Sequence, residues 1–174
     1  MEIRYPAKPN ELPRVLIAQP HAGYLGALGR RIAEQGFRVA LAETVQVAVA
    51  ELHRLPVDLV LAELQGPGFC GRELVTIIRD DANFRDLPVL LFTGRSDHDA
   101  AVRALRCGAD GVVKKPFHFE VLCARIGREL ERKRAMDALR GDKAVLDARV
   151  VERAIEIGEL REQLRDVRRG SHAL

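Results

Sequence analysis

The sequence predicts an α/β protein in which a doubly wound, five-stranded parallel sheet is followed by a long C-terminal helix. Two observations indicate this class. First, short apolar segments alternate with segments of helical spacing between residues 14 and 130. The apolar segments lack polar alternation, so both faces of each strand should be buried, as in parallel sheets covered by helices on both sides. Second, apolar residues recur every three or four positions after residue 136, which is typical of a coiled coil.

The elements follow one another in strict alternation. The predicted strands span residues 14–18, 37–42, 57–64, 88–92 and 110–115. The predicted helices span residues 26–36, 44–55, 71–80 and 97–108, with a long helical stretch from residue 118. Thr44 is an expected N-cap and Gly36 an expected helix end. We therefore divide the chain into a leader (1–13), an α/β domain (14–130), a coiled-coil helix (131–169) and a tail (170–174).

Composition excludes several classes of protein. Charged residues make up 30% of the 174 residues, and no apolar run approaches the ~20 residues of a transmembrane helix. The N-terminus lacks a signal peptide, and three widely spaced cysteines without a CxxC motif indicate reduced thiols, so we expect a cytoplasmic protein without membrane insertion. The net charge of +3 is mild and no helix-turn-helix follows Leu130, so nucleic acid is not an expected partner.

Ligands in open parallel sheets bind beyond the carboxyl ends of the strands, so the residues that follow each strand are the candidates for a site. They are Gln19 and Pro20 after the first strand, Glu63 at the end of the third, Thr93 after the fourth and Lys115 after the fifth. The segments around them read "PVDLVLAEL", "GPGFCGREL", "LPVLLFTG" and "GADGVVKKPF". In this order they resemble a response-regulator receiver domain of two-component signalling, over residues 14–130.

The resemblance implies a flavodoxin-like receiver fold and a site for phosphoryl transfer. In that family an aspartate at the end of the third strand accepts a phosphoryl group from a histidine kinase, and two acids after the first strand bind magnesium with it. A Thr or Ser after the fourth strand and a Lys after the fifth contact the phosphoryl oxygens. Thr93 and Lys115 match these last two positions, and the fourth and fifth helices are the docking face that the resemblance implies.

This sequence departs from the family at the chemically critical positions. Glu63 occupies the acceptor position, Gln19 and Pro20 occupy the acid pair, and Val112 replaces the aromatic switch residue of the fifth strand. Magnesium requires hard oxygen ligands, usually one or two carboxylates, and metal neutralisation is much of phosphoryl-transfer catalysis. We therefore expect a degenerate pocket that neither binds magnesium tightly nor accepts phosphate, with no cofactor and no enzymatic activity.

Three interpretations of Glu63 remain open from the sequence. Its carboxylate could reach Lys115 and Thr93 and imitate a phosphorylated state, or it could form a structural ion pair that fills an abandoned pocket. A third alternative pairs Glu63 with His21 as metal ligands. The absence of an aromatic switch at Val112 favours the structural ion pair.

The C-terminal segment carries a heptad seam. The a and d positions alternate from residue 136, and eight of the ten are apolar: Met136, Leu139, Leu146, Val150, Ile157, Leu160, Leu164 and Val167, with Lys143 and Arg153 as exceptions. β-branched residues at a with Leu at d favour a parallel dimer. A helix from residue 119 to 167 would be about 70 Å long, longer than a domain of this size is wide, so an apolar stripe along it needs a partner. The segment also resembles the signalling helices that join receivers to output domains.

We therefore expect a phosphorylation-independent receiver-like module that acts by parallel homodimerisation and by contact with another signalling protein. The alternative is a phosphoryl-accepting receiver that relays its state through the coiled coil to an output domain, such as a cyclic-di-GMP enzyme or a kinase. The missing acids at Gln19 and Pro20 count against this alternative.

Overall fold

The computed structural model describes residues 12–94 and 99–170, and the side chains of residues 166–170 are excluded from the description. The chain separates into two compact units, residues 1–133 and 134–174. The predicted tail beyond Gly170 and most of the predicted leader lie outside the described residues. Pro13, at the end of that leader, is buried, and its carbonyl accepts a hydrogen bond of 2.9 Å from the amide of Arg38.

The first unit contains the predicted five-stranded parallel sheet, so the predicted fold class is confirmed. Its strand order is β2-β1-β3-β6-β7, and each neighbouring pair is parallel. The strands are β1 (Arg14–Ala18), β2 (Arg38–Ala42), β3 (Leu59–Glu63), β6 (Val89–Thr93) and β7 (Gly111–Lys114). The order reverses beside β1, because β2 lies on one side of it and β3 on the other. All five strands are parallel, so their carboxyl ends lie at the same edge, and the switch point between β1 and β3 is where ligands bind in such sheets.

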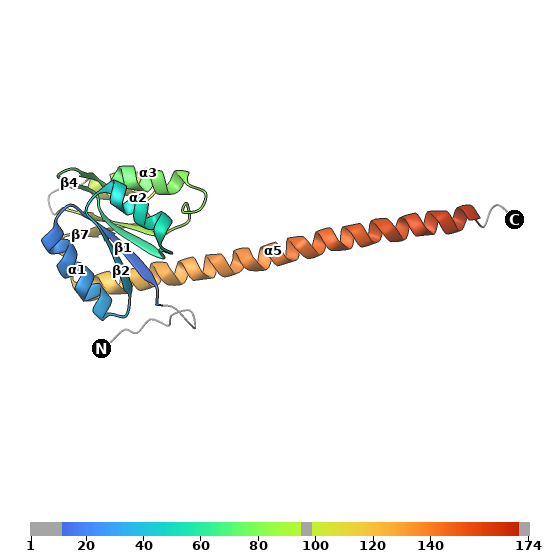
Figure 1. Cartoon of the computed structure of the whole chain (residues 1–174), viewed down its shortest axis with the longest axis horizontal. Coiled ribbons are helices and arrows are strands. Elements are labelled where there is room, and N and C mark those ends of the chain that lie inside the picture. The colour runs from blue at the N-terminus through green and yellow to red at the C-terminus, as the bar shows by residue number, and fades with distance from the viewer. Residues whose placement is uncertain (1–11, 95–98, 171–174) are drawn as a thin grey trace. The chain divides into compact units, whose positions relative to one another are not determined.

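Helices cover both faces of this sheet, as Figure 1 shows. They are α1 (Ala22–Glu34), α2 (Val45–Arg54), α3 (Gly71–Asp80), α4 (Ala100–Arg106) and the start of α5 (Phe119–Gly170). The sheet has one apolar core on each face. One joins α2, α3 and α4 to the sheet through residues such as Leu52, Leu74 and Ala104. The other joins α1 and α5 to the opposite face, through residues such as Ile32 and Ile126. Continuous apolar strands are buried on both sides by this arrangement, as predicted.

The helix ends follow ordinary capping chemistry. Thr44 is the predicted N-cap of α2, and its hydroxyl accepts a hydrogen bond of 3.2 Å from the amide of Val47. Gly36 follows α1 with a φ of 85°, which favours glycine. The predicted start of α1 at residue 26 is wrong by four positions, because the helix begins at Ala22 and includes Gly23. Local propensity misses this start because glycine disfavours a helix interior.

A short hairpin after β3 was not predicted. The strands β4 (Gln65–Gly66) and β5 (Phe69–Cys70) pair antiparallel, and Gly68 supplies a turn with a φ of 65°. Two-residue strands are too short to leave a periodic signal in the sequence. The hairpin leads directly into α3 at Gly71. A Cβ atom there would lie 2.1 Å from the carbonyl oxygen of Glu63, so the close approach of the two backbones requires glycine.

The helix α5 is 52 residues long and changes character along its length. Leu122, Ile126 and Leu130 are buried in the first unit. Every described side chain from residue 136 to residue 165 is exposed. Within the part of the chain that the structure describes, no helix is long and apolar enough to cross a membrane.

Candidate functional site

Four of the predicted site residues lie at the carboxyl edge of the sheet. Gln19 directly follows β1, Glu63 ends β3, Thr93 ends β6 and Lys115 directly follows β7. Thr93 was expected after its strand and is instead the strand's last residue. Because β6 lies between β3 and β7, a side chain from Lys115 must reach across the end of β6 to meet Glu63.

Glu63 and Lys115 form an ion pair across this edge. The Lys115 ammonium donates a short hydrogen bond to one carboxylate oxygen of Glu63. The Glu63 side chain is 13% exposed and that of Lys115 is 29% exposed, so the pair is shielded from water on most sides. The backbone amide of Lys115 also donates a hydrogen bond of 2.8 Å to the carbonyl of Thr93, which fixes the lysine against β6.

Two aromatic rings lie close to the Lys115 ammonium. The Nζ atom lies 4.8 Å from the ring centre of Tyr24 and 5.3 Å from that of Phe92. A cation over an aromatic face is attracted to the ring electrons. Burial, and secondarily the charge of Glu63, raises the pKa of the Tyr24 hydroxyl, so this phenol stays neutral. The ring of Phe92 stacks in turn on Phe117 at 5.3 Å. Lys115 therefore occupies a defined place between a carboxylate and two rings.

Gln19 and Pro20 replace ligand oxygens with a neutral amide and an apolar ring. Gln19 is fully buried, its amide nitrogen donates a long hydrogen bond of 3.5 Å to the carbonyl of His21, and its Oε1 has no partner among the described residues. The Pro20 ring packs on the hairpin, because a Cβ atom at Gly66 would lie 2.7 Å from Pro20 Cγ. Both positions therefore contribute to packing and offer no negative charge.

Thr93 and Val112, the other two positions singled out from the sequence, are both at least partly buried in the sheet. The Thr93 side chain is buried, and among the described hydrogen bonds none joins it to Glu63. The carboxylate of Glu63 thus reaches Lys115, and the predicted contact with Thr93 is not formed. Val112 is half-buried in β7, and its carbonyl accepts a short hydrogen bond from the Arg125 guanidinium.

These residues do not fit a magnesium ion. The carboxylate of Glu63 is already paired with Lys115. The two positions after β1 offer one side-chain oxygen, that of the uncharged Gln19 amide. No group of three His, Cys, Asp or Glu side chains suited to a metal occurs in residues 12–94 and 99–165. His21 is exposed, and within these same residues no third side chain joins His21 and Glu63 to complete a metal site.

A second ion pair, between Arg79 and Asp110, was not expected from the sequence. The Arg79 guanidinium donates to a carboxylate oxygen of Asp110 at 2.7 Å and to three backbone carbonyls: those of Gly108, Arg85 and Leu87, at 2.8–2.9 Å. The same carboxylate oxygen accepts from the amide of Val89 at 2.9 Å. Arg79 thus joins α3 to the loops before β6 and β7. The residues are about thirty positions apart, so no local sequence pattern signals the contact.

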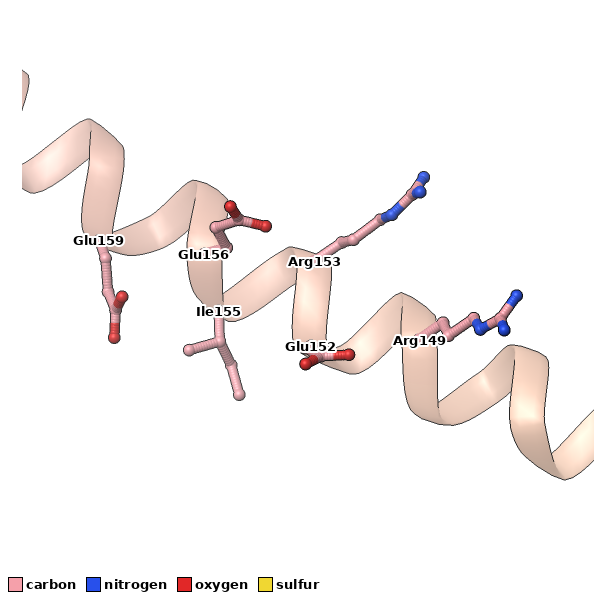
Figure 2. Close-up of a pocket in the computed structure, with 6 residues that line it drawn as sticks. All are labelled: Arg149, Glu152, Arg153, Ile155, Glu156 and Glu159. Atoms are coloured by element: carbon pink, nitrogen blue, oxygen red, sulfur yellow. The ribbon is translucent and has the colours of Figure 1, made fainter.

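The second unit contains the seam residues and one shallow hollow. The described apolar seam side chains, from Met136 to Leu164, are 47–66% exposed, and the side chain of Val167 lies outside the description. The hollow lies on a single helix and is lined by Arg149, Glu152, Arg153, Ile155, Glu156 and Glu159. Figure 2 shows that Arg153 and Ile155 point to opposite sides of α5. These side chains diverge, so the hollow cannot enclose a ligand.

Comparison with known proteins agrees with this architecture. Residues 15–127 match the family model of the response regulator receiver domain. The chain is 31% identical over 119 residues to the phosphate regulon transcriptional regulatory protein PhoB of Klebsiella pneumoniae, which covers 68% of this chain and 52% of that protein. A putative response regulator from Chloroflexus aurantiacus superposes with a TM-score of 0.66 at 22% identity, over 70% of this chain and 99% of that structure.

A further relative is matched beyond the receiver domain. It is a probable cyclic di-GMP phosphodiesterase of Vibrio cholerae, 27% identical over 150 residues, or 80% of this chain and 34% of that protein. The aligned region covers 80% of this chain, and only 14 residues precede the receiver match at residue 15. An aligned region of that length must therefore extend past residue 127 into α5. The chain spans no more than about half the length of either curated relative.

The fold and the family match define a class of protein: a receiver domain of the response regulators, which act in signalling. This chain belongs to the response regulator receiver domain family.

Proposed function

We propose that this chain is a receiver that signals without phosphorylation, through dimerisation and protein–protein contact. One observation carries the proposal. The residue at the acceptor position, Glu63, is held in an ion pair with Lys115, and no carboxylate occupies the two positions after β1. A phosphoryl donor that approached this site would meet no cation able to neutralise the transferred group, because the one nearby ammonium is already paired.

The same pair gives the pocket a fixed state. In a receiver that accepts a phosphoryl group, the Thr and Lys of the site can move to contact that group. Here Lys115 is already held by Glu63 and by the rings of Tyr24 and Phe92. Val112 offers no ring that could change position with the pocket. We infer that the ion pair is structural and that regulation comes from assembly and from the concentration of the partners.

The seam of α5 provides the means of assembly. It consists of Met136, Leu139, Leu146, Val150, Ile157, Leu160, Leu164 and Val167, interrupted by Lys143 and Arg153. Exposed apolar side chains at heptad spacing gain free energy when a second helix covers them. The residue choice at a and d favours two parallel strands. Charges at Lys143 and Arg153 lower the stability of the coil and discourage misaligned registers.

A partner protein would bind the first unit at the surface formed by α4, β7 and the start of α5. Val102 and Leu105 on α4 and Val121 on α5 are 48–55% exposed there. Exposed aliphatic side chains on the two helices that flank the edge strand β7 are suited to contact with a partner helix or hairpin. The contact would not depend on phosphorylation.

The second candidate function is a phosphoryl-accepting receiver that controls an output domain through α5. The observation in its favour is the similarity to the probable cyclic di-GMP phosphodiesterase, which continues beyond the receiver domain into the helix. Under this alternative the acceptor would be Glu63 itself or a residue outside the pocket.

Intact mass spectrometry after incubation with acetyl phosphate and magnesium distinguishes the two candidates. We expect no adduct of about 80 Da on the wild-type chain. The positive control combines Glu63→Asp with Gln19→Asp and Pro20→Asp, which restores three carboxylates, and its circular dichroism spectrum verifies that it folds. Any wild-type adduct would replace the proposal by the second candidate. Loss of that adduct in Glu63→Ala would assign it to Glu63, and its persistence would assign it to a residue outside the pocket.

A further inference from the structure

The helix α5 carries a second apolar face that the seam does not include. It consists of Gly141, Ala144, Ala148, Val151, Ile155 and Gly158, at spacings of three and four residues. The two large side chains on it, Val151 and Ile155, are each 59% exposed. Asp137 and Glu162 occupy the next positions of the same spacing, so the face ends at an acid on both sides.

This face points away from the seam. At about 100° per residue, it is centred about 160° around the helix from the seam. Figure 2 shows the consequence at one turn, where Ile155 points to the opposite side of α5 from Arg153, which is a seam position. A two-stranded coiled coil covers only the a and d positions. Dimerisation through the seam therefore leaves the second face uncovered.

The order of side-chain sizes along the face makes it complementary to itself in one orientation. When two copies run antiparallel about a point between Ala148 and Val151, Ala148 lies opposite Val151 of the other copy. In the same register Ala144 lies opposite Ile155, and Gly141 lies opposite Gly158. Each large side chain then meets an alanine, so the two helix axes can keep one separation over the four layers between Ala144 and Ile155.

A parallel arrangement of the same face packs poorly. It would place Val151 against Val151 and Ile155 against Ile155, while Ala144 and Ala148 would each meet a second alanine. The bulky layers would hold the axes apart and leave voids at the alanine layers, which lose contacts. The size pattern thus distinguishes antiparallel from parallel pairing, and it names the occupant as another copy of this same segment.

We propose that the second apolar face pairs antiparallel with the same face of another copy of the chain, and so joins seam dimers into larger assemblies. Each contact is isologous, because both copies contribute the same residues. The number of chains per assembly rests on the proposed seam dimer. Pairing through the second apolar face does not depend on that dimer.

Sedimentation equilibrium over a range of protein concentrations tests the proposal. We expect the wild-type mass to rise above that of a dimer with increasing concentration. Val151→Glu should weaken this step by about tenfold or more and leave the dimer, because the carboxylate would lie in an apolar contact. Ala138→Glu is the matched control, since it adds the same charge at an exposed position outside both faces, and it should behave as wild type. A wild-type mass that stays at the dimer at all concentrations, together with an equally dimeric Val151→Glu chain, would overturn the proposal.

Disulfide crosslinking tests the orientation. Chains with Ala144→Cys and chains with Ile155→Cys are mixed, oxidised and digested, and the linked peptides are identified by mass, which separates them from links through Cys70, Cys107 or Cys123. We expect a 144–155 link between chains. A dominant 144–144 link would reject the antiparallel pairing.

A seam variant separates this proposal from the proposed function. Leu146→Asp removes an apolar seam residue and leaves the second face intact. If the second face pairs, this variant should still form a dimer that Val151→Glu dissociates. A wild-type chain that is dimeric only through the second face would contradict the seam dimer and retain the inference, whereas a strictly monomeric Leu146→Asp chain would contradict the inference.

Discussion

The ammonium of Lys115 is paired with the carboxylate of Glu63 across the end of β6, between residues 52 positions apart in the chain. In a receiver these are the phosphoryl-contacting and phosphoryl-accepting positions. Here they satisfy each other, and Tyr24 and Phe92 border the same ammonium. The ion pair and the two rings together fill this part of the sheet edge.

This pair should contribute measurably but modestly to stability. A double-mutant cycle with Glu63→Gln and Lys115→Met should give a coupling free energy of about 1 kcal/mol in urea unfolding, because both groups are largely shielded but desolvation opposes the attraction. Dimer mass should be unchanged in both variants. A changed oligomeric state in Glu63→Gln would instead favour Glu63 as an imitation of phosphorylation.

Gly71 should tolerate no side chain. Gly71→Ala places a Cβ atom 2.1 Å from the carbonyl oxygen of Glu63, and backbone on both sides must move, so we expect a loss of about 2 kcal/mol or more in the free energy of unfolding. Gly26→Ala is the control, because its Cβ atom would meet nothing within 4 Å inside α1. This second variant should be more stable than wild type by about 0.5–1 kcal/mol. Equal effects in the two variants would contradict the close approach at Gly71.

Arg79 should be a major stabilising residue despite its position near the surface. Arg79→Met removes donors from three carbonyls and from Asp110, which leaves a partly buried carboxylate with its strongest partner gone, so we expect a loss of about 3 kcal/mol in urea unfolding. Arg30→Met, an exposed arginine on α1, should change the free energy of unfolding by less than about 0.5 kcal/mol. A loss at Arg79 no larger than that at Arg30 would show that the network contributes little.

Cys123 should make stability fall at high pH. Burial, and secondarily the charge of Glu120, raises the pKa of its thiol from the usual value of 9.0 to about 11. The unfolded chain therefore releases the thiol proton first as pH rises, and the stability present below pH 9 is lost progressively between about pH 9 and pH 11. Urea unfolding at pH 8 and pH 10 should show this loss, and Cys123→Ala should reduce it. An identical pH dependence in the two chains would contradict the assignment to Cys123.

The seam should be sensitive to charge at its apolar layers. Leu146→Asp should shift the seam dimer toward monomer by at least about tenfold in dissociation constant, because a carboxylate would replace a leucine between two helices. Ala138→Asp, at an exposed position outside the seam, should leave the dissociation constant within about twofold of wild type. Sedimentation equilibrium measures both at concentrations where only the seam contact forms.

The sequence by itself determined the features that depend on near neighbours. Alternating apolar and helical segments predicted the sheet, Thr44 predicted a cap, and the heptad spacing after Met136 placed apolar residues on one side of a long helix. It also placed Gln19, Glu63 and Lys115 at one edge, because parallel strands end together. Tertiary structure alone decided which side chains meet there. Glu63 bonds to Lys115 and not to Thr93, Tyr24 lies over the lysine, and Arg79 reaches Asp110. Such contacts depend on how segments far apart in the sequence pack together and on which rotamers their side chains adopt. Neither leaves a periodic pattern in the sequence.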